Sequence, residues 1–84
     1  MRFFYITFRS VTYAQRGEQV LQAEGIRCTL QRTPKWMEER GCGYCLRLWT
    51  SDARRAVELL RSQRVVYRKV YAQREDGTFE ERPL

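Results

Sequence analysis

Residues 42–49 read CGYCLRLW, and the alternation within this stretch decides how the chain is expected to fold. A period of two divides the side chains from residue 44 onward between the opposite faces of a strand: Tyr44, Leu46 and Leu48 on one face, and Cys45, Arg47 and Trp49 on the other. Helix-capping residues follow only at 50–52. The two cysteines, spaced C-x-x-C, therefore lead into a strand and not into a helix.

Three other segments have the composition and spacing of strands. Residues 2–8 and 26–31 alternate between apolar and other side chains, and the second of these segments has Cys28 on its inward side. Residues 65–71 are rich in β-branched and aromatic residues. Two choices of the inward face remain open for this last strand: Val66 with Val70, or Val65 with Tyr67.

Two helices are predicted between these strands. Ser10 and Thr12 are N-cap candidates for the first helix, which continues at helical spacing until Gly25 ends it. Residues 50–52 are expected to cap the second helix. The buried stripe of that helix consists of four apolar residues: Ala53, Ala56, Val57 and Leu60.

The order strand, helix, strand, strand, helix, strand indicates an α+β protein, a ferredoxin-like βαββαβ sandwich whose four-stranded antiparallel sheet has two helices on one face. We expect one domain over residues 1–72 and a polar, mobile C-terminal tail over residues 73–84. The second face of the sheet is left open, so we expect a partner to cover it, with a homodimer as one form. The side chains expected on this face are Phe3, Tyr5, Arg47 and Trp49.

The composition narrows the classes of function. The 84 residues include no histidine, which removes the imidazole that most familiar catalytic sites use. The net charge of +6 favours anionic partners, although basic residues spread along the whole chain are also typical of a solvated surface. No segment approaches the roughly 20 apolar residues of a membrane span, and the first residues do not resemble a signal peptide. Three cysteines cannot all pair, so we expect a reducing, cytoplasmic location, with Cys28 simply buried.

The cysteines meet only some of the requirements of a redox site or a metal site. A dithiol redox site needs its first cysteine at a helix N-terminus, where the dipole favours the thiolate, but a strand follows Cys42. A structural zinc site needs four ligands, and three thiols without histidine would supply them only in a dimer. We therefore expect no metal and no other cofactor, and keep a small dithiol redox protein as an alternative.

Nucleic-acid binding is a second alternative. Residues 40–44, RGCGY, resemble the RNP1 signature of RNA recognition motifs, which share this order of elements. However, Cys42 stands in place of the first stacking aromatic residue, and Tyr44 falls on the inward face. Binding of RNA or single-stranded nucleic acid through the open, aromatic and basic face is therefore kept as an alternative function.

The chain resembles the Se/S carrier protein-like family, small ferredoxin-like proteins that also occur fused to sulfur-carrier-type domains in proteins of selenium metabolism. The resemblance covers residues 3–71 and depends mainly on the Cys-Gly at 42–43, placed after the loop that begins at Thr33 and Pro34. The other matching residues are Ile6, Thr7, Phe8, Ser10, Ala14, Glu18, Val20, Leu21, Gly25, Ile26, Leu46, Arg47 and Leu48.

This resemblance implies a carrier rather than a stand-alone enzyme. Cys42 would accept sulfur or selenium as a persulfide from a donor protein and pass it to an acceptor enzyme. Cys45 is either a resolving thiol or an inert strand residue, since residues i and i+3 of a strand point to opposite faces. The competing interpretation of Cys42 is a small residue in a glycine turn. The residues expected to stabilise the thiolate are Arg9, Ser10, Arg40, Gly41 and Gly43.

Overall fold

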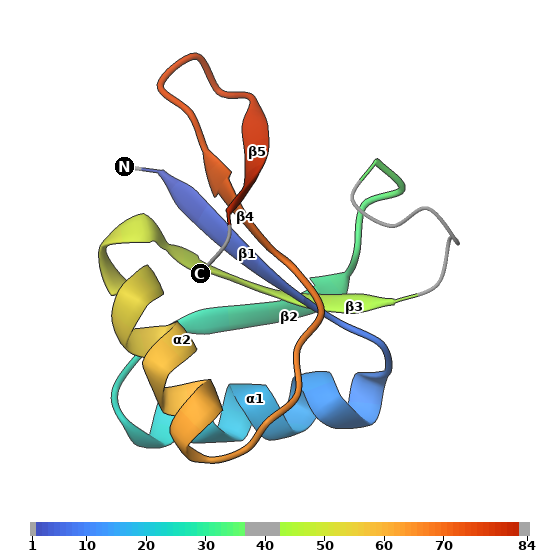
Figure 1. Cartoon of the computed structure of the whole chain (residues 1–84), viewed down its shortest axis with the longest axis vertical. Coiled ribbons are helices and arrows are strands. Elements are labelled where there is room, and N and C mark those ends of the chain that lie inside the picture. The colour runs from blue at the N-terminus through green and yellow to red at the C-terminus, as the bar shows by residue number, and fades with distance from the viewer. Residues whose placement is uncertain (1, 37–42, 83–84) are drawn as a thin grey trace.

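The computed structural model describes residues 2–36 and 43–82, which form two α-helices and a five-stranded antiparallel sheet (Figure 1). In chain order the elements are β1 (Phe3–Phe8), α1 (Val11–Ala23), β2 (Cys28–Arg32), β3 (Tyr44–Trp49), the 3₁₀ helix η1 (Thr50–Asp52), α2 (Ala53–Ser62), β4 (Val70–Gln73) and β5 (Phe79–Arg82). The strands lie in the order β2-β3-β1-β4-β5. The α+β class is confirmed, whereas the four-stranded ferredoxin-like sheet is not confirmed in that detail, because a fifth strand is present.

The pair β1–β3 forms the centre of the sheet. The two strands are paired along their whole length, from Phe3 opposite Trp49 to Phe8 opposite Tyr44. Alternate side chains of both strands are buried against the helices, as the two-residue period predicts: Phe4, Ile6, Phe8, Leu46 and Leu48. Both helices pack on this face and complete the hydrophobic core (Figure 1).

Helix α1 begins and ends where the sequence predicts. Ser10 is the N-cap, and its hydroxyl accepts a hydrogen bond from the backbone N–H of Tyr13 at 3.4 Å. Gly25 follows the last turn with φ +78°, a left-handed conformation that glycine adopts without steric cost. Gly17 allows α1 to lie close to the sheet, because a Cβ atom there would meet Cζ of Phe8 at 3.0 Å.

Helix α2 buries the predicted stripe of small and apolar residues against the core. Asp52, one of the three predicted capping residues, is the N-cap of α2, but it makes no side-chain capping hydrogen bond, and residues 50–52 form η1. Within the described part of the chain, no helix is long and apolar enough to cross a membrane.

The fourth strand is shorter than the sequence predicts. A strand is expected over residues 65–71, but β4 comprises only Val70–Gln73. Val65 and Val70 are both buried, although an uninterrupted strand would turn them to opposite faces, and Val66 is 64% exposed. Of the two predicted inward faces, Val66 with Val70 is wrong because Val66 is exposed, whereas Val65 and Tyr67 both pack against the core. The two-residue period is interrupted before β4.

Thr7 explains this interruption. Its backbone carbonyl accepts a hydrogen bond from the N–H of Arg68 at 2.7 Å, and its own N–H donates to the carbonyl of Lys69 at 2.8 Å. Its buried hydroxyl accepts a further bond from the N–H of Lys69 at 3.1 Å. The segment before β4 is thus held against β1 without forming a regular ladder.

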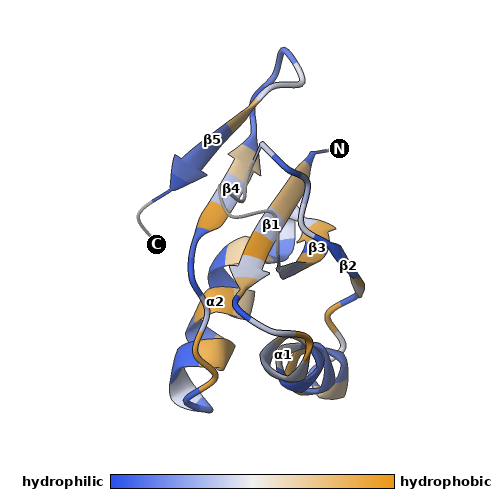
Figure 2. Ribbon diagram, turned by 90° about the vertical axis from the view of Figure 1, so that its right-hand side faces the viewer, coloured by the Kyte–Doolittle hydropathy of each residue, from blue (hydrophilic) through white to orange (hydrophobic). Residues whose placement is uncertain are grey.

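The segment predicted as a polar tail contains β5, which pairs with β4 at the outer edge of the sheet. The turn between them includes a hydrogen bond from the N–H of Arg74 to the carbonyl of Thr78, at 2.6 Å, and Gly77 at φ +90°. The Arg74 side chain also forms an ion pair with Glu80 across the hairpin. Figure 2 shows that β5 is largely hydrophilic, so hydrophobic periodicity gives no signal for this strand.

Candidate functional site

Three of the predicted site residues, Arg40, Gly41 and Cys42, lie outside the residues that the structure describes. The described chain resumes at Gly43, directly before β3. Gly43 is buried, and its carbonyl accepts a hydrogen bond from the backbone N–H of Thr33 at 3.1 Å. This bond joins the two ends of the segment whose sequence includes the Cys-Gly motif.

The end of β1 lies beside the start of β3. Phe8 pairs with Tyr44, so the residues after Phe8 and those before Tyr44 leave the sheet at the same end of the two strands. These two strand ends form one edge of the sheet. Arg9 is exposed at this edge, and Ser10 caps α1 there. Figure 1 shows that β3 and α1 both begin at this end of the molecule. The structure therefore brings together three predicted site residues, Arg9, Ser10 and Gly43.

The described residues at this edge of the sheet give it a positive charge. The first turn of α1 has no acidic residue, so the partial positive charge of the helix N-terminus is not offset. Arg32, at the end of β2, lies over the ring of Tyr44, with 5.5 Å between its guanidinium carbon and the ring centre. Together with the exposed Arg9, these groups favour a negative charge at the edge.

Cys45 faces away from the helices, yet its side chain is fully buried. Its sulfur lies 4.0 Å from the backbone oxygen of Arg32, and the buried hydroxyl of Thr33 has no hydrogen-bond partner among residues 2–36 and 43–82. Burial raises the pKa of the Cys45 thiol from 9.0 to about 11, and the neighbouring Thr33, Arg47 and Gln31 side chains offset only part of this rise. At neutral pH the Cys45 thiol is therefore protonated and closed to solvent.

Cys28 lies at the start of β2, where it is half-buried on the side of the sheet that faces the helices. Burial and the nearby Glu18 carboxylate raise the pKa of its thiol to about 11. Cys28 and Cys45 point to opposite faces of the sheet, so they cannot pair with each other. Residues 2–36 and 43–82 contain no group of three His, Cys, Asp or Glu side chains placed to hold a metal ion.

The face of the sheet away from the helices bears the four side chains predicted for it, all of them half-buried. Phe3 and Trp49 stack with 4.7 Å between their ring centres and 13° between their planes. The guanidinium carbon of Arg47 lies 4.5 Å from the centre of the Phe3 ring, in a cation–π contact. The fourth of these side chains, Tyr5, packs against a residue of β5 instead.

The part of this face around Tyr5 is covered by the chain itself. Phe79 of β5 meets Tyr5 edge to face, with ring centres 5.1 Å apart. Trp36, from the loop after β2, lies 5.2 Å from Phe79 and 5.8 Å from Tyr71. The face is thus partly closed, and the sequence did not predict the role of Trp36 or Phe79. An isolated aromatic residue in each of two polar segments is the only signal that would have indicated them.

The fold and these thiols define a small α+β protein whose two described cysteines, Cys28 and Cys45, are both unpaired. The model of one protein family, described as "Putative Se/S carrier protein-like", matches residues 3–72. The chain therefore belongs to the Se/S carrier protein-like family, which confirms the resemblance seen in the sequence. The comparisons found no match among curated proteins and none among solved structures.

Proposed function

We propose that this protein carries sulfur or selenium as a persulfide or selenopersulfide on Cys42 and passes that atom to a partner enzyme. The observation that carries the proposal is membership of the Se/S carrier protein-like family over residues 3–72, together with the Cys-Gly motif directly before β3. A carrier of this kind requires two partner proteins, a donor and an acceptor.

The chemistry of the other two thiols supports the choice of Cys42. Only a thiolate is an effective nucleophile, and burial raises the pKa of both Cys28 and Cys45 to about 11. At pH 7 such thiols are ionised in roughly one molecule in 10⁴. Cys42 is the one remaining cysteine of the sequence.

The surroundings of Gly43 support the same choice. Cys42 directly precedes Gly43 in the sequence. Gly43 belongs to the positive edge of the sheet, with Arg9, Arg32 and the start of α1. Positive charge near a thiol favours its ionised form, which is the form that a carrier must use.

The proposed transfer is an exchange of one chalcogen atom without net oxidation. The Cys42 thiolate attacks the outer sulfur of a donor persulfide, a new S–S bond forms, and the donor cysteine leaves as a thiolate as the old S–S bond breaks. A nucleophile of the acceptor then attacks the same outer sulfur, and Cys42 leaves as a thiolate. Selenium in the outer position follows the same sequence of bonds.

Two other functions are less well supported. A dithiol redox site would need a helix after Cys42 and an accessible Cys45, but β3 follows the motif and Cys45 is buried. Binding of nucleic acid across the sheet would need an open aromatic face, but Trp36 and Phe79 cover the part around Tyr5.

Three finer features belong to the same proposal. We infer that β1 to β4 and the two helices form a ferredoxin-like unit that β5 extends, in view of the strand order β2-β3-β1-β4. Unpaired thiols favour a reducing compartment, which is the basis for a cytoplasmic location. A homodimer through the open face of the sheet, which bears Phe3, Tyr5, Arg47 and Trp49, remains a prediction, and light scattering at micromolar concentration tests it.

Mass spectrometry tests the central proposal. The protein is incubated with a cysteine desulfurase and cysteine, and the expected result is a gain of about 32 Da, one sulfur atom, on the peptide containing Cys42. The variant Cys42→Ser should show no such gain. Absence of the gain in the unaltered protein would contradict the proposal.

A further inference from the structure

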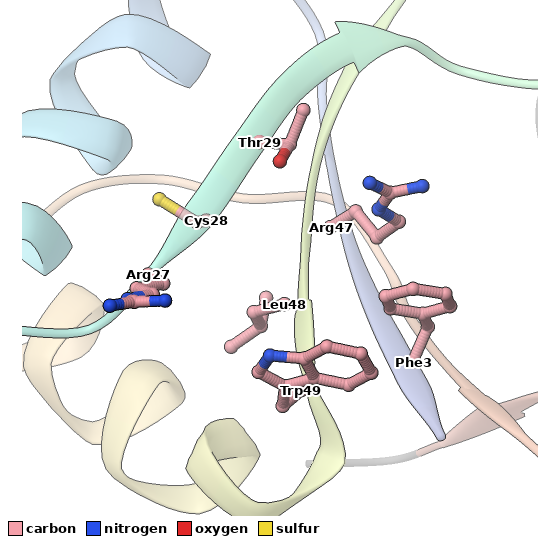
Figure 3. A pocket seen from close by; sticks show the side chains of 7 residues that line it. All are labelled: Phe3, Arg27, Cys28, Thr29, Arg47, Leu48 and Trp49. Carbon is pink, nitrogen blue, oxygen red and sulfur yellow. The ribbon is translucent and has the colours of Figure 1, made fainter. Parts of the chain in front are cut away.

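A pocket of about 190 Å³ lies at the end of the sheet where β1 begins and β3 ends. Figure 3 shows Arg27 on the β2 side of this pocket, with Phe3 and Arg47 on the opposite side and Trp49 between them. The strand β3 rises about 3.3 Å per residue, so Trp49 lies about 16 Å from the start of β3. The pocket is therefore a separate site from the edge around Gly43.

The lining of this pocket is positively charged. It includes two arginines, Arg27 and Arg47, and no acidic residue. Neither guanidinium forms an ion pair with a carboxylate in residues 2–36 and 43–82. Two unpaired guanidinium groups around one hollow attract an anion, and each can donate two parallel hydrogen bonds to a carboxylate.

Arg47 is held in place before any ligand binds. Its guanidinium carbon lies 4.5 Å from the centre of the Phe3 ring, and Phe3 itself is stacked on Trp49. A guanidinium with one face against a ring keeps its N–H groups free in the plane of the group. Less side-chain entropy is then lost when an anion binds.

The remaining walls suit a flat, partly apolar molecule. Trp49 and Phe3 present half-exposed aromatic rings to the pocket, and Thr29 adds an exposed residue with a hydroxyl group. Aromatic rings pack well against flat ligands, and such contacts add to the attraction of the charges. The volume is below the roughly 300 Å³ at which pockets begin to hold drug-sized ligands, so the occupant is small.

We infer that this pocket binds a small organic anion with a flat apolar part, of which an aromatic carboxylate is the simplest example. The positive charges of Arg27 and Arg47, on the two sides of the pocket, attract the carboxylate, and the half-exposed ring of Trp49 beside Phe3 contacts the flat part. The inference goes beyond the carrier function and does not depend on Cys42, so each can fail without the other.

Titration followed by NMR tests the inference on the full chain. The ¹⁵N-labelled protein is titrated at constant ionic strength with benzoate, with its neutral analogue benzamide, and with inorganic phosphate. Benzoate is expected to shift the indole N–H of Trp49 and the amides of Thr29 and Arg47 in a saturable manner. Benzamide and phosphate are each expected to bind at least about tenfold more weakly, because each lacks one of the two recognised features.

Three variants complete the test. Arg27→Gln and Arg47→Gln should each raise the Kd for benzoate by about tenfold, as loss of a charge-assisted hydrogen bond implies. Arg16→Gln, which removes the same charge from an exposed position of α1, should leave the Kd unchanged. Because Arg27 is exposed and precedes β2, its variant should keep the native spectrum even if Arg47→Gln disturbs the fold.

Several results would overturn the inference. These are shifts that do not saturate, equal binding of benzoate and benzamide, equal binding of benzoate and phosphate, or an equal loss of affinity in Arg16→Gln. A short single-stranded RNA that binds these residues more tightly than benzoate, with a steep dependence on salt, would assign the pocket to nucleic acid instead.

Discussion

Phe8 of β1 pairs with Tyr44 of β3, and this pairing joins two parts of the chain that are distant in the sequence. One part is the start of α1, with Arg9 and the N-cap Ser10. The other is Gly43, the residue that follows the proposed carrier cysteine. The arrangement makes the positive edge a consequence of the strand register, which the buried side chains of β1 and β3 fix.

The first prediction concerns the charge at this edge. Arg9→Gln should lower the rate at which iodoacetamide modifies Cys42 at pH 7, by about twofold to threefold, because less positive charge stabilises the thiolate. Quantitative peptide mapping by mass spectrometry measures this rate. Arg54→Gln, an equal loss of charge at an exposed position of α2, is the matched control. An equal effect of the two variants would show that Arg9 has no particular role.

The second prediction concerns the buried thiol of Cys45. Burial raises its pKa from 9.0 to about 11. Below pH 9 the folded and unfolded chains both keep this proton, and it has no effect on the pH dependence of stability. Between pH 9 and 11 the unfolded chain loses the proton first. The free energy of unfolding should therefore fall as pH rises, by up to about 1.4 kcal/mol per pH unit from this group.

Cys45→Ala isolates that contribution. At pH 7 the variant should lose about 1 kcal/mol of stability, because a small buried side chain is shortened. Its free energy of unfolding should then fall less steeply than that of the unaltered protein between pH 9 and 11. Urea denaturation at pH 7, 9 and 10.5 measures both effects, with the exposed substitution Val66→Ala as control. Parallel pH profiles for the two proteins would contradict the buried thiol as the cause.

The third prediction concerns Trp36 and Phe79, whose rings lie 5.2 Å apart. Their contact links the loop after β2 to the β4–β5 hairpin. A double-mutant cycle with Trp36→Ala and Phe79→Ala should give a coupling free energy of about 0.5 kcal/mol, at the low end for aromatic pairs because Trp36 is 57% exposed. The cycle of Trp36→Ala with Val66→Ala should be additive. Additivity in both cycles would mean that the aromatic contact does not hold the loop.

The fourth prediction concerns the packing of α1 on the sheet. A Cβ atom at Gly17 would lie 3.0 Å from Cζ of Phe8 and 3.3 Å from Cδ1 of Leu46, and both of these side chains are fully buried. Gly17→Val should therefore destabilise the protein by about 2 kcal/mol. Gln19→Val, at an exposed position of the same helix, should cost less than about 0.5 kcal/mol. Similar losses in the two variants would show that the close contact can relax.

The sequence predicts most of the sheet and both helices because these elements obey a regular period. The alternation in β1 and β3 identifies the buried side chains, and Ser10 with Gly25 marks the ends of α1. The prediction is wrong before β4, where hydrogen bonds to Thr7 replace a regular ladder and the period is interrupted. That interruption depends on hydrogen bonds between residues distant in the sequence, and a local sequence pattern carries no information about them.

The sequence likewise predicts only part of the candidate site. The position of Arg9 beside Gly43 follows from the strand order and register, once β1 and β3 are recognised as neighbours. The burial of Cys45 does not follow, because its face of the sheet is expected to be open. β5 was missed because its one apolar residue, Phe79, gives no periodic signal among charged neighbours.

The carrier function depends on which cysteine accepts sulfur, and three single-cysteine variants decide this most directly. Each variant keeps one of Cys28, Cys42 and Cys45 and has serine or alanine at the other two positions. After incubation with a cysteine desulfurase and cysteine, the variant that keeps Cys42 is predicted to gain about 32 Da, and the other two are predicted to gain nothing. Loading of the Cys28 or Cys45 variant, or no loading of the Cys42 variant while it remains folded, would contradict the assignment of Cys42 as the carrier thiol.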